Sequence, residues 1–201
     1  MLTHTYALVA LSVEQKKVQL RVRDIQECMQ RLRTSRAFSD RGKLESLLKA
    51  LFGLNEIFAT RNFELFVLPA LRAATEEVNK LLTEIEQLSY LNNEILKSLR
   101  ERWSRATDYS GPEMVEFCDA IELYCQQLST RLAIEESHLL PVAQRAISGD
   151  EWFDIAAQFI SHESERGTRK TSDRRVNANP TPSPSYVAGY MPGGSVHLAV
   201  G

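Results

Sequence analysis

Apolar residues recur at intervals of three and four along most of the first 162 residues, which is the spacing of one face of an α-helix. Four stretches carry such a stripe, and none shows a strand-like alternation of useful length. The pattern therefore predicts four long helices and an all-α fold. The stripes consist of Val18, Val22, Ile25, Met29 and Leu32; Leu44, Leu47, Leu51, Leu54 and Phe58; Val78, Leu81, Ile85, Leu88, Asn92, Ile95 and Leu99; and Phe117, Ile121, Tyr124, Leu128, Arg131, Glu135 and His138.

The ends of these helices follow from local signals. The second helix is expected to continue through the segment RNFELFVLPAL, and the third to start near Glu76. The fourth starts at DYSGPE, because Pro112 suits a first helical turn, where its missing N–H would have no partner. A short fifth helix is predicted for DEWFDIAAQFI. Narrow stripes on four helices indicate an antiparallel four-helix bundle made by residues 1–162.

The composition changes near His162. Five of the nine glycines and four of the seven prolines come after that residue, and large aliphatic residues become rare. Residues 163–201 are therefore predicted to be a disordered tail. Its basic residues either contact an acidic partner or belong to a solvated linker; they are Arg166, Arg169, Lys170, Arg174 and Arg175.

Charge and cysteine content narrow the class of protein. Lys and Arg number 24 against 26 Asp and Glu, so no global field attracts nucleic acid or an anionic membrane. The cysteines Cys28, Cys118 and Cys125 are odd in number and form no CxxC pair, which fits a reduced compartment. No apolar run reaches the roughly 18–20 residues of a membrane span. We expect a cytoplasmic protein that binds neither nucleic acid nor a membrane.

Two segments echo each other, because FELFVLPAL and EESHLLPVA both combine acidic and apolar residues with a proline. With these endings, residues 12–162 resemble the hemerythrin-like family, also called HHE cation-binding domains. The segment from LLPVA to GDEW carries the strongest part of the likeness. The resemblance implies a four-helix bundle that holds two iron ions with histidine and carboxylate ligands. In that family, HxxxE segments precede an apolar run and a proline on helices two and four.

The family's ligand positions hold other residue types here. Counting back from Pro141 places the helix-four histidine at Arg131 and its glutamate at Glu135. Counting back from Pro69 in the same register gives Ala59 and Phe63. The inward histidines of helices one and three correspond to Ile25 and Ile85, within one turn. Only Glu135 keeps a ligand type, so the resemblance implies a member without its metal site, and we expect no metal ion and no other cofactor.

Arg131 and Glu135 lie one turn apart on a stripe that is otherwise apolar. A guanidinium has no lone pair to give to a metal, and an unpaired charge inside a protein is very costly. We therefore predict a structural ion pair in which Arg131 replaces the positive charge of the metal and keeps Glu135 ionised. Ala59, Phe63, Ile25 and Ile85 would fill the remaining space. The alternative is a rotated helix that leaves both charges in solvent.

A working di-iron site remains the alternative cofactor hypothesis. It would draw on Glu64, Glu135, Glu136 and His138, because Glu-x-x-His is a spacing that ferritin-like bundles use for iron. Glu84 and Glu86 are further candidate ligands, although their positions fit a solvated helix face. We find no phosphate-binding glycine loop and no catalytic triad, so no catalytic residue is assigned.

The function expected from the sequence is a non-catalytic binding or regulatory module that has lost a di-iron site. The partner, a protein or a small molecule, is not identified by the sequence, nor is the oligomeric state. The first alternative is a di-iron protein that binds oxygen, nitric oxide or iron through unusual carboxylate ligands. A second alternative is a docking bundle that works through residues 163–201.

Overall fold

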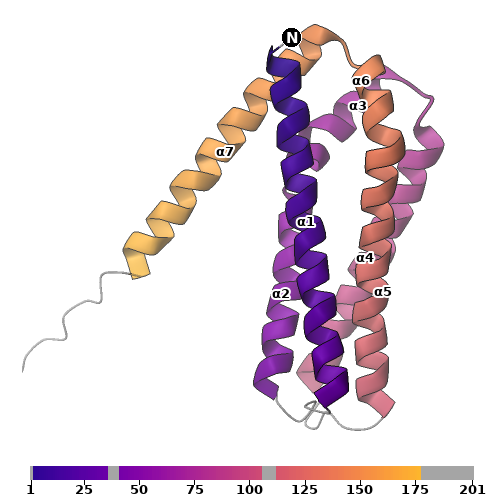
Figure 1. The fold of residues 1–201 in the computed structure, drawn as a ribbon, viewed down its shortest axis with the longest axis vertical. Coiled ribbons are helices and arrows are strands. Elements are labelled where there is room, and N and C mark those ends of the chain that lie inside the picture. Colours follow the sequence, from indigo (N-terminus) through magenta and orange to yellow (C-terminus); the bar gives the residue numbers. More distant parts are fainter. Residues whose placement is uncertain (1, 36–40, 106–111, 178–201) are drawn as a thin grey trace, which may run out of the picture. The chain divides into compact units, whose positions relative to one another are not determined.

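The computed structural model describes residues 2–35, 41–105 and 112–177, and these residues form helices and short turns without any strand (Figure 1). This agrees with the all-α prediction. The long helices are α1 (Leu2–Ser35), α2 (Arg41–Ala59), α4 (Asn79–Arg105), α5 (Pro112–Ile134) and α7 (Gly149–Asn177). The short helices are α3 (Leu68–Ala74) and α6 (Leu140–Ala146), and each comes after a π-helical turn, η2 (Phe63–Val67) or η3 (Glu135–Leu139).

The chain divides into two units, Met1–Glu163 and Ser164–Gly201. Helix α7 continues to Asn177, so residues 163–177 of the predicted disordered tail are helical. No proline occurs between Pro141 and Pro180, and the backbone therefore keeps every amide donor that a helix needs. The predicted disorder of residues 178–201 lies outside the described residues.

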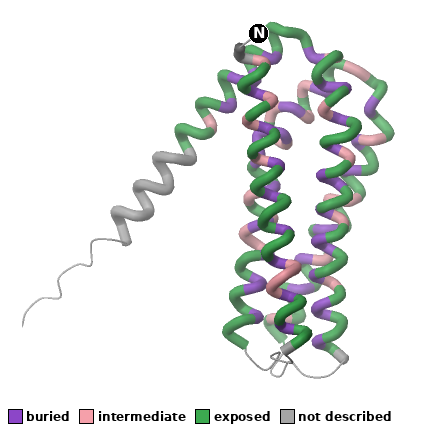
Figure 2. The backbone as a smooth tube through the Cα atoms, in the orientation of Figure 1, coloured by how far each residue is buried: buried purple, intermediate pink, exposed green. Residues whose placement is uncertain are grey.

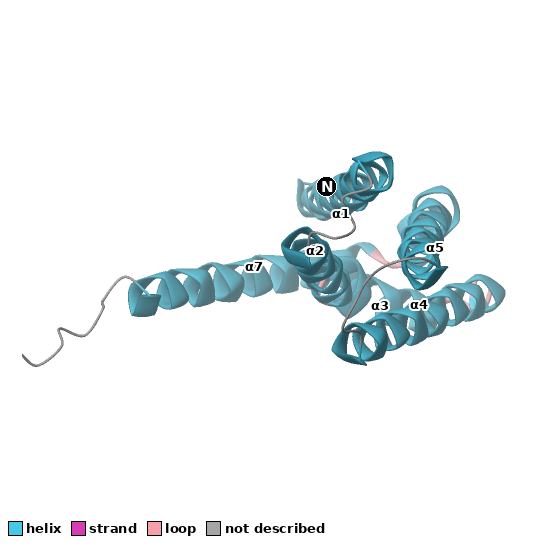
Figure 3. Ribbon diagram, turned by 90° about the horizontal axis from the view of Figure 1, so that it is seen from below, coloured by secondary structure: helices cyan, strands magenta, loops and turns pink. Residues whose placement is uncertain are grey.

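Within the first unit, α1 packs against both α2 and α5, and α5 also packs against α4. Figure 3 looks along the long helices and shows α1 next to α2 on one side and next to α5 on the other. Figure 1 shows that α1 and α2 run in opposite directions. Among the helices of the described residues, none is long and apolar enough to cross a bilayer.

The buried residues follow most of the predicted stripes, and Figure 2 shows them alternating with exposed positions along each helix. Every apolar member of the first, second and fourth stripes is buried. In the third stripe, Leu81, Leu88 and Ile95 are only partly buried, whereas Leu82 and Leu96 belong to the core. His138 closes the predicted fourth stripe but is exposed, because η3 changes the helical register before it.

The second helix does not continue as predicted. It ends at Ala59, the chain turns at Thr60 and Arg61, and the π-helical turn η2 comes next. In η2 the Leu68 N–H bonds to the Phe63 carbonyl, and in η3 the Leu140 N–H bonds to the Glu135 carbonyl. Each turn ends two residues before a proline, Pro69 or Pro141. A proline removes one helical donor and crowds the carbonyl four residues earlier, and a wider turn relieves that crowding.

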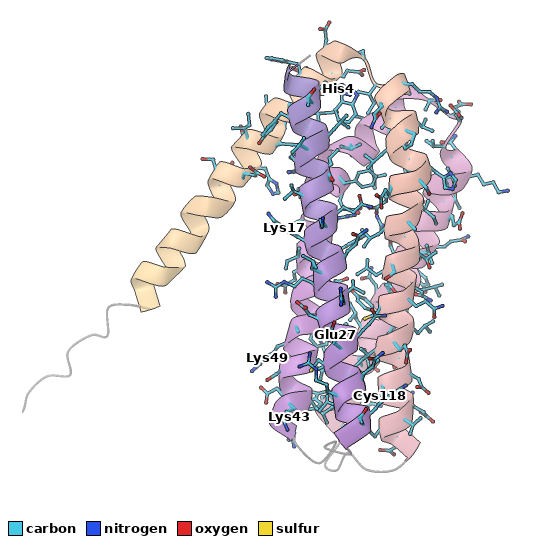
Figure 4. The ribbon with its side chains drawn as sticks, in the orientation of Figure 1. His4, Lys17, Glu27, Lys43, Lys49 and Cys118 are labelled. Atoms are coloured by element: carbon cyan, nitrogen blue, oxygen red, sulfur yellow. The ribbon has the colours of Figure 1, made fainter. Side chains whose placement is uncertain are left out.

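The buried residues fall into two apolar clusters. One is built from α1, α2, α4 and α5, and includes Phe58 and Leu128. The other gathers the start of α1, the two short helices, and α7 up to Phe159. In the second cluster the His4 ring meets Trp152 edge to face at 5.1 Å, and Figure 4 labels His4 near the start of α1. The core is therefore divided along the length of the helices.

The three cysteines are free thiols in different surroundings. Cys118, labelled in Figure 4, and Cys125 are buried on α5, and Cys28 on α1 is half-buried. Burial raises the pKa of Cys125 to about 12, with a smaller contribution from Glu122. Burial likewise raises the pKa of Cys118, against a lowering by Arg33. Both α5 thiols therefore stay protonated near neutral pH.

We predict that iodoacetamide at pH 8 modifies Cys28 in the folded chain and leaves Cys118 and Cys125 unmodified. The thiolate is the reactive form, and the two α5 thiols are both buried and protonated. Mass spectrometry of tryptic peptides would locate the label, with a sample labelled in urea as the control. Labelling of Cys125 without denaturant would contradict the burial of its side chain on α5.

The raised pKa of Cys125 also predicts an alkaline loss of stability. The pKa of an unfolded cysteine thiol is about 8.5, whereas the pKa of Cys125 in the folded chain is about 12. This contribution to stability is therefore complete below the unfolded pKa and is lost as the pH rises through the folded one. The melting temperature of Cys125→Ala should fall less steeply between pH 9 and 11 than that of the unchanged chain. Cys28→Ala is the matched control and should keep the original slope.

Candidate functional site

Four charged residues lie inside the first unit, where the two apolar clusters meet. Arg61 lies just beyond the end of α2 and Glu64 lies in η2, while Arg131 lies in the last turn of α5 and Glu135 begins η3. Their side chains are 3%, 16%, 6% and 2% exposed, respectively. We call these four residues the ion quartet. Two positive and two negative charges make it neutral.

Arg131 contacts both carboxylates of the quartet. Its Nη2 donates to Glu64 Oε1 and Oε2 at 2.8 and 2.7 Å, and its Nε donates to Glu135 Oε1 at 3.1 Å. Its Nη1 donates to the hydroxyl of Ser89 on α4. All three nitrogens of this guanidinium therefore have acceptors, and they join α5 to η2, η3 and α4.

Arg61 contacts the same two carboxylates from the other side of the quartet. Its Nη2 lies 2.7 Å from Glu64 Oε1 and 2.9 Å from each oxygen of Glu135. The buried Nε of Arg61 has no hydrogen-bond partner. Each carboxylate is thus shared by two guanidiniums, and each guanidinium by two carboxylates.

Phe58 provides an aromatic surface for both cations. The Cζ atoms of Arg61 and Arg131 lie 4.0 and 4.6 Å from the centre of its ring. A cation near an aromatic face gains attraction that grows when water is excluded. The ring therefore stabilises the positive charges and also separates them from the apolar cluster around α2.

Burial disfavours the charged form of each quartet residue, so it lowers the pKa of an arginine and raises the pKa of a glutamate. Burial alone would lower the pKa of Arg61, but the Glu135 and Glu64 carboxylates outweigh it and raise the pKa above the usual arginine value. Burial raises the pKa of Glu135, and the charges of Arg61 and Arg131 offset only part of that effect. Arg61 is therefore a permanent cation, and Glu135 depends on its two partners to remain ionised.

Two neighbouring residues of α1 bind the backbone where the helices are irregular. Glu14 Oε2 accepts the Asn62 N–H at 2.9 Å, at the entry to η2. Gln15 Nε2 donates to the Leu132 carbonyl at 2.9 Å, just before η3. Turns and π-helical segments leave backbone groups without helical partners, and buried backbone groups need one. Helix α1 thus forms a hydrogen bond with the backbone next to each of the two irregular segments.

The two irregular segments share one internal spacing. Phe63 begins η2 and Glu135 begins η3, each six residues before a proline, Pro69 or Pro141. One turn earlier stand Ala59 and Arg131. At these two positions the π-helical turn η2 therefore has an apolar pair, Ala59 and Phe63, and η3 has a charged pair, Arg131 and Glu135.

The positions inferred from the family resemblance have different environments. Arg131 and Glu135 are buried and paired, and Phe63, Ile25 and Ile85 are buried in apolar clusters. Ala59 is exposed, so the expectation that it fills the interior is wrong. The reason is the turn at Thr60 and Arg61, which breaks the four-residue register between Ala59 and Phe63.

The residues suggested for an unusual iron site do not come together. His138, Glu136, Glu84 and Glu86 are exposed. Glu136 lies 3.4 Å from Gln15 Nε2, and Glu86 pairs with Arg72 on the surface. Among the described residues, no group of three or more metal-binding side chains is close enough to hold an ion. Glu64 and Glu135 are near each other, but both are engaged by guanidiniums.

The stripes did not single out Arg61, which is buried, and Glu64 was expected only as a metal ligand. A signal was present for Arg61, because it continues the stripe of Leu51, Leu54 and Phe58 at the next helical interval. A charged residue on an apolar stripe indicates a buried partner. Arg131 shows the same signal on α5.

An open-sided cavity of about 770 Å³ borders the quartet and is lined by residues of α2, η2, α3, α4 and α5. Glu64 and Arg131 contribute to one wall, and Ala59 lies at its edge. Phe58, Ile85 and Leu128 supply apolar surface. The site therefore combines a neutral charged network with adjoining space of the size of a small-molecule pocket.

No protein-family model, curated protein or solved structure matches this chain. The chemistry of the site therefore has to be argued from its own geometry. Both carboxylates of the quartet accept hydrogen bonds from two cations, and neither cation can donate a lone pair. In this arrangement the quartet holds helices together and offers no free base or nucleophile.

We predict that the quartet is stable as a neutral set and unstable when one charge is removed. Arg61→Met leaves Glu135 with fewer donors and should lower the free energy of unfolding by about 3–5 kcal/mol. The double variant Arg61→Met/Glu135→Leu removes one charge of each sign and should be less destabilised than the single variant. Urea unfolding followed by circular dichroism measures both.

The matched control is Arg102→Met, because Arg102 forms an exposed pair with Glu116 at 3.0 Å. Its loss should change stability by no more than about 1 kcal/mol. Equal costs for Arg61→Met and Arg102→Met would show that the quartet is not buried as described.

Proposed function

We propose that this chain is a hemerythrin-like, antiparallel four-helix bundle without a metal site, acting as a non-catalytic binding or regulatory module in a reducing compartment. The observation that carries this proposal is the ion quartet. Two guanidiniums occupy the place between the two π-helical turns where converging carboxylates would otherwise be free to bind a cation.

The sequence resemblance supports the bundle part of the proposal. The echo of FELFVLPAL and EESHLLPVA corresponds to the repeated π turn and proline in the structure. The packing of α1 with α2 and α5, and of α4 with α5, is compatible with an antiparallel bundle. Free cysteines support the reducing compartment.

Electrostatics argue against a cation at the quartet. Four charges that sum to zero leave no excess negative potential, and an added divalent ion would meet two buried cations at close range. A metal would first have to displace several charge-assisted hydrogen bonds. The structure also brings no histidine of the described residues to the quartet, since His138 is exposed, His4 lies beside Trp152 and His162 beside Phe66.

Binding is favoured over catalysis because of what borders the quartet. An enzyme site needs a group that can take or give a proton or an electron pair during the reaction. The charged groups beside the cavity are committed to each other, whereas the cavity offers apolar surface and polar side chains. A module that recognises a molecule without transforming it fits this combination.

We predict that the chain purified from iron-supplemented cells contains no stoichiometric iron. Its melting temperature should be the same in EDTA and in excess ferrous iron, because a ligand of the folded state would raise it by mass action. Elemental analysis and calorimetry measure the two quantities. About two iron atoms per chain, with a near-ultraviolet oxo-iron band, would establish the di-iron alternative instead.

A charge-altered variant tests why the metal is excluded. Arg61→His/Arg131→His replaces both cations by groups that can ligate, beside the two carboxylates of the quartet. This variant should gain a metal-dependent rise in melting temperature with zinc, whereas Arg102→His should not. A zinc response in the unchanged chain equal to that of the variant would contradict the proposed role of the guanidiniums.

A further inference from the structure

The first half of α1 has a second apolar stripe, on the side of the helix that faces away from the core. Its four members are large, apolar and exposed: Tyr6 (37% exposed), Val9 (57%), Val13 (47%) and Leu20 (53%). Leu11 and Val18 of the same stretch are buried. Because successive residues of an α-helix are rotated by about 100°, the exposed four lie roughly opposite the buried two.

The exposed stripe has the three-and-four spacing of a coiled-coil seam. Tyr6, Val13 and Leu20 are seven residues apart and share one seam position, and Val9 occupies the other. The exposed Lys16 holds the remaining seam position, between Val13 and Leu20. A charge covered by a partner needs an opposite charge, so this lysine favours a partner that has an acidic group at that register.

The charges beside the stripe are positive and have no counterpart. Lys16, Lys17 and Arg21 are exposed, and none of them forms an ion pair with another residue that the structure describes; Lys17 is labelled in Figure 4. Glu14 is the only acidic residue between Tyr6 and Arg21. Its carboxylate accepts the backbone N–H at the entry to η2. The stripe therefore lies in a locally basic surface, although the net charge of the chain is only −2.

Beyond Leu20 the outer side of α1 is an ordinary solvated helix face. Arg23 and Arg31 both pair with Glu27, and no large apolar residue of the described part of α1 is exposed after Leu20. At the other end of the stripe, the Tyr6 hydroxyl bonds to the Glu163 carboxylate of α7. The surface is thus about 21 Å long, which corresponds to four helical turns.

We propose that residues 6–21 of α1 are a docking surface for an acidic amphipathic helix of a partner protein, and we call them the α1 docking face. Apolar side chains of the partner helix would pack between Val9, Val13 and Leu20. Its carboxylates would pair with Lys16, Lys17 and Arg21. This inference rests on the proposed function, because it names the partner class of the binding module.

Two other occupants fit the α1 docking face less well. Two copies of this face would bring together only basic residues and Glu14, whose carboxylate already bonds to the backbone, so Lys16 and Lys17 would remain unpaired. A bilayer surface needs a broad apolar face that can enter the lipid. The stripe on α1 is one residue wide and is interrupted by a lysine, and this width is typical of a contact between two helices.

Two synthetic peptides of three heptads test the charge of the partner. Both have leucine at the seam positions, except that one peptide has glutamate, and the other lysine, at the central seam position and at the flanking positions. The acidic peptide should bind the full chain with a Kd of about 100 μM or tighter, and the basic peptide at least tenfold more weakly. Salt at about 1 M should weaken the binding of the acidic peptide, because it screens exposed charges. Fluorescence anisotropy of the labelled peptides measures these affinities.

Three variants connect binding to the α1 docking face. Val9→Glu places a carboxylate in the stripe and should weaken binding of the acidic peptide at least tenfold. Val115→Glu on α5 is the matched control, because Val115 is 58% exposed and Val9 57%, and it should bind as the unchanged chain does. Lys16→Glu/Lys17→Glu should reverse the preference, so that the basic peptide binds more tightly. All three should keep the melting temperature of the unchanged chain, because the substituted residues are exposed.

The inference is overturned if the acidic peptide gives no saturable binding up to about 1 mM, if both peptides bind equally well, or if Val9→Glu binds with unchanged affinity. A dimer in analytical ultracentrifugation that Val9→Glu abolishes would assign the face to a second copy instead. Binding to vesicles of phosphatidylserine and phosphatidylcholine that Val9→Glu abolishes would assign it to a membrane. Either result would also overturn the inference.

The iron content of the same sample separates this failure from that of the proposed function. A metal-free chain that binds neither peptide rejects only the partner class. A chain that contains stoichiometric iron rejects the proposed function whatever the peptides do.

Discussion

Charge neutrality inside the ion quartet is the constraint on which the arrangement of helices depends. A single guanidinium or carboxylate withdrawn from water costs several kcal/mol unless it is paired and hydrogen-bonded. Arg61 and Glu64 come from one half of the chain, and Arg131 and Glu135 from the other. Neither half can shift relative to the other without leaving a buried charge unpaired. Apolar contacts are non-directional and cannot impose this register. The two apolar clusters therefore stabilise the fold, and the quartet fixes the positions of the helices relative to one another.

The quartet can form because the π-helical turns η2 and η3 each begin six residues before a proline. Pro69 and Pro141 each remove a backbone donor, and the π-helical turns before them absorb the disturbance. A π-helical turn adds one residue, and it rotates the helix on its N-terminal side relative to the helix on its C-terminal side. The irregular backbone needs partners of its own, and α1 provides them through Glu14 and Gln15. A local property of proline thus leads to a long-range polar network.

Periodicity alone predicts the helices but not how the quartet is completed. The stripes of α1 and α5 are buried as the three-and-four spacing implies, because regular helices keep that register throughout. Arg61 continues the stripe of α2 and is buried, whereas counting back from Pro69 fails at Ala59, which is exposed because the turn at Thr60 and Arg61 breaks the register between Ala59 and Phe63. The partners of Arg131 could not be read from its own helix alone. Glu135 is four residues away, whereas Glu64 is brought near only by the packing of η2.

Pairing inside the quartet is extensive but not complete. Each carboxylate has several donors, whereas the buried Nε of Arg61 has no partner. Carboxylates that are already shared between two cations stabilise the native arrangement and have little left to offer a ligand. Asn92 Oδ1 on α4 is likewise buried and has no hydrogen-bond partner. The structural role therefore belongs to the four charges, which join α5 to η2, η3 and α4.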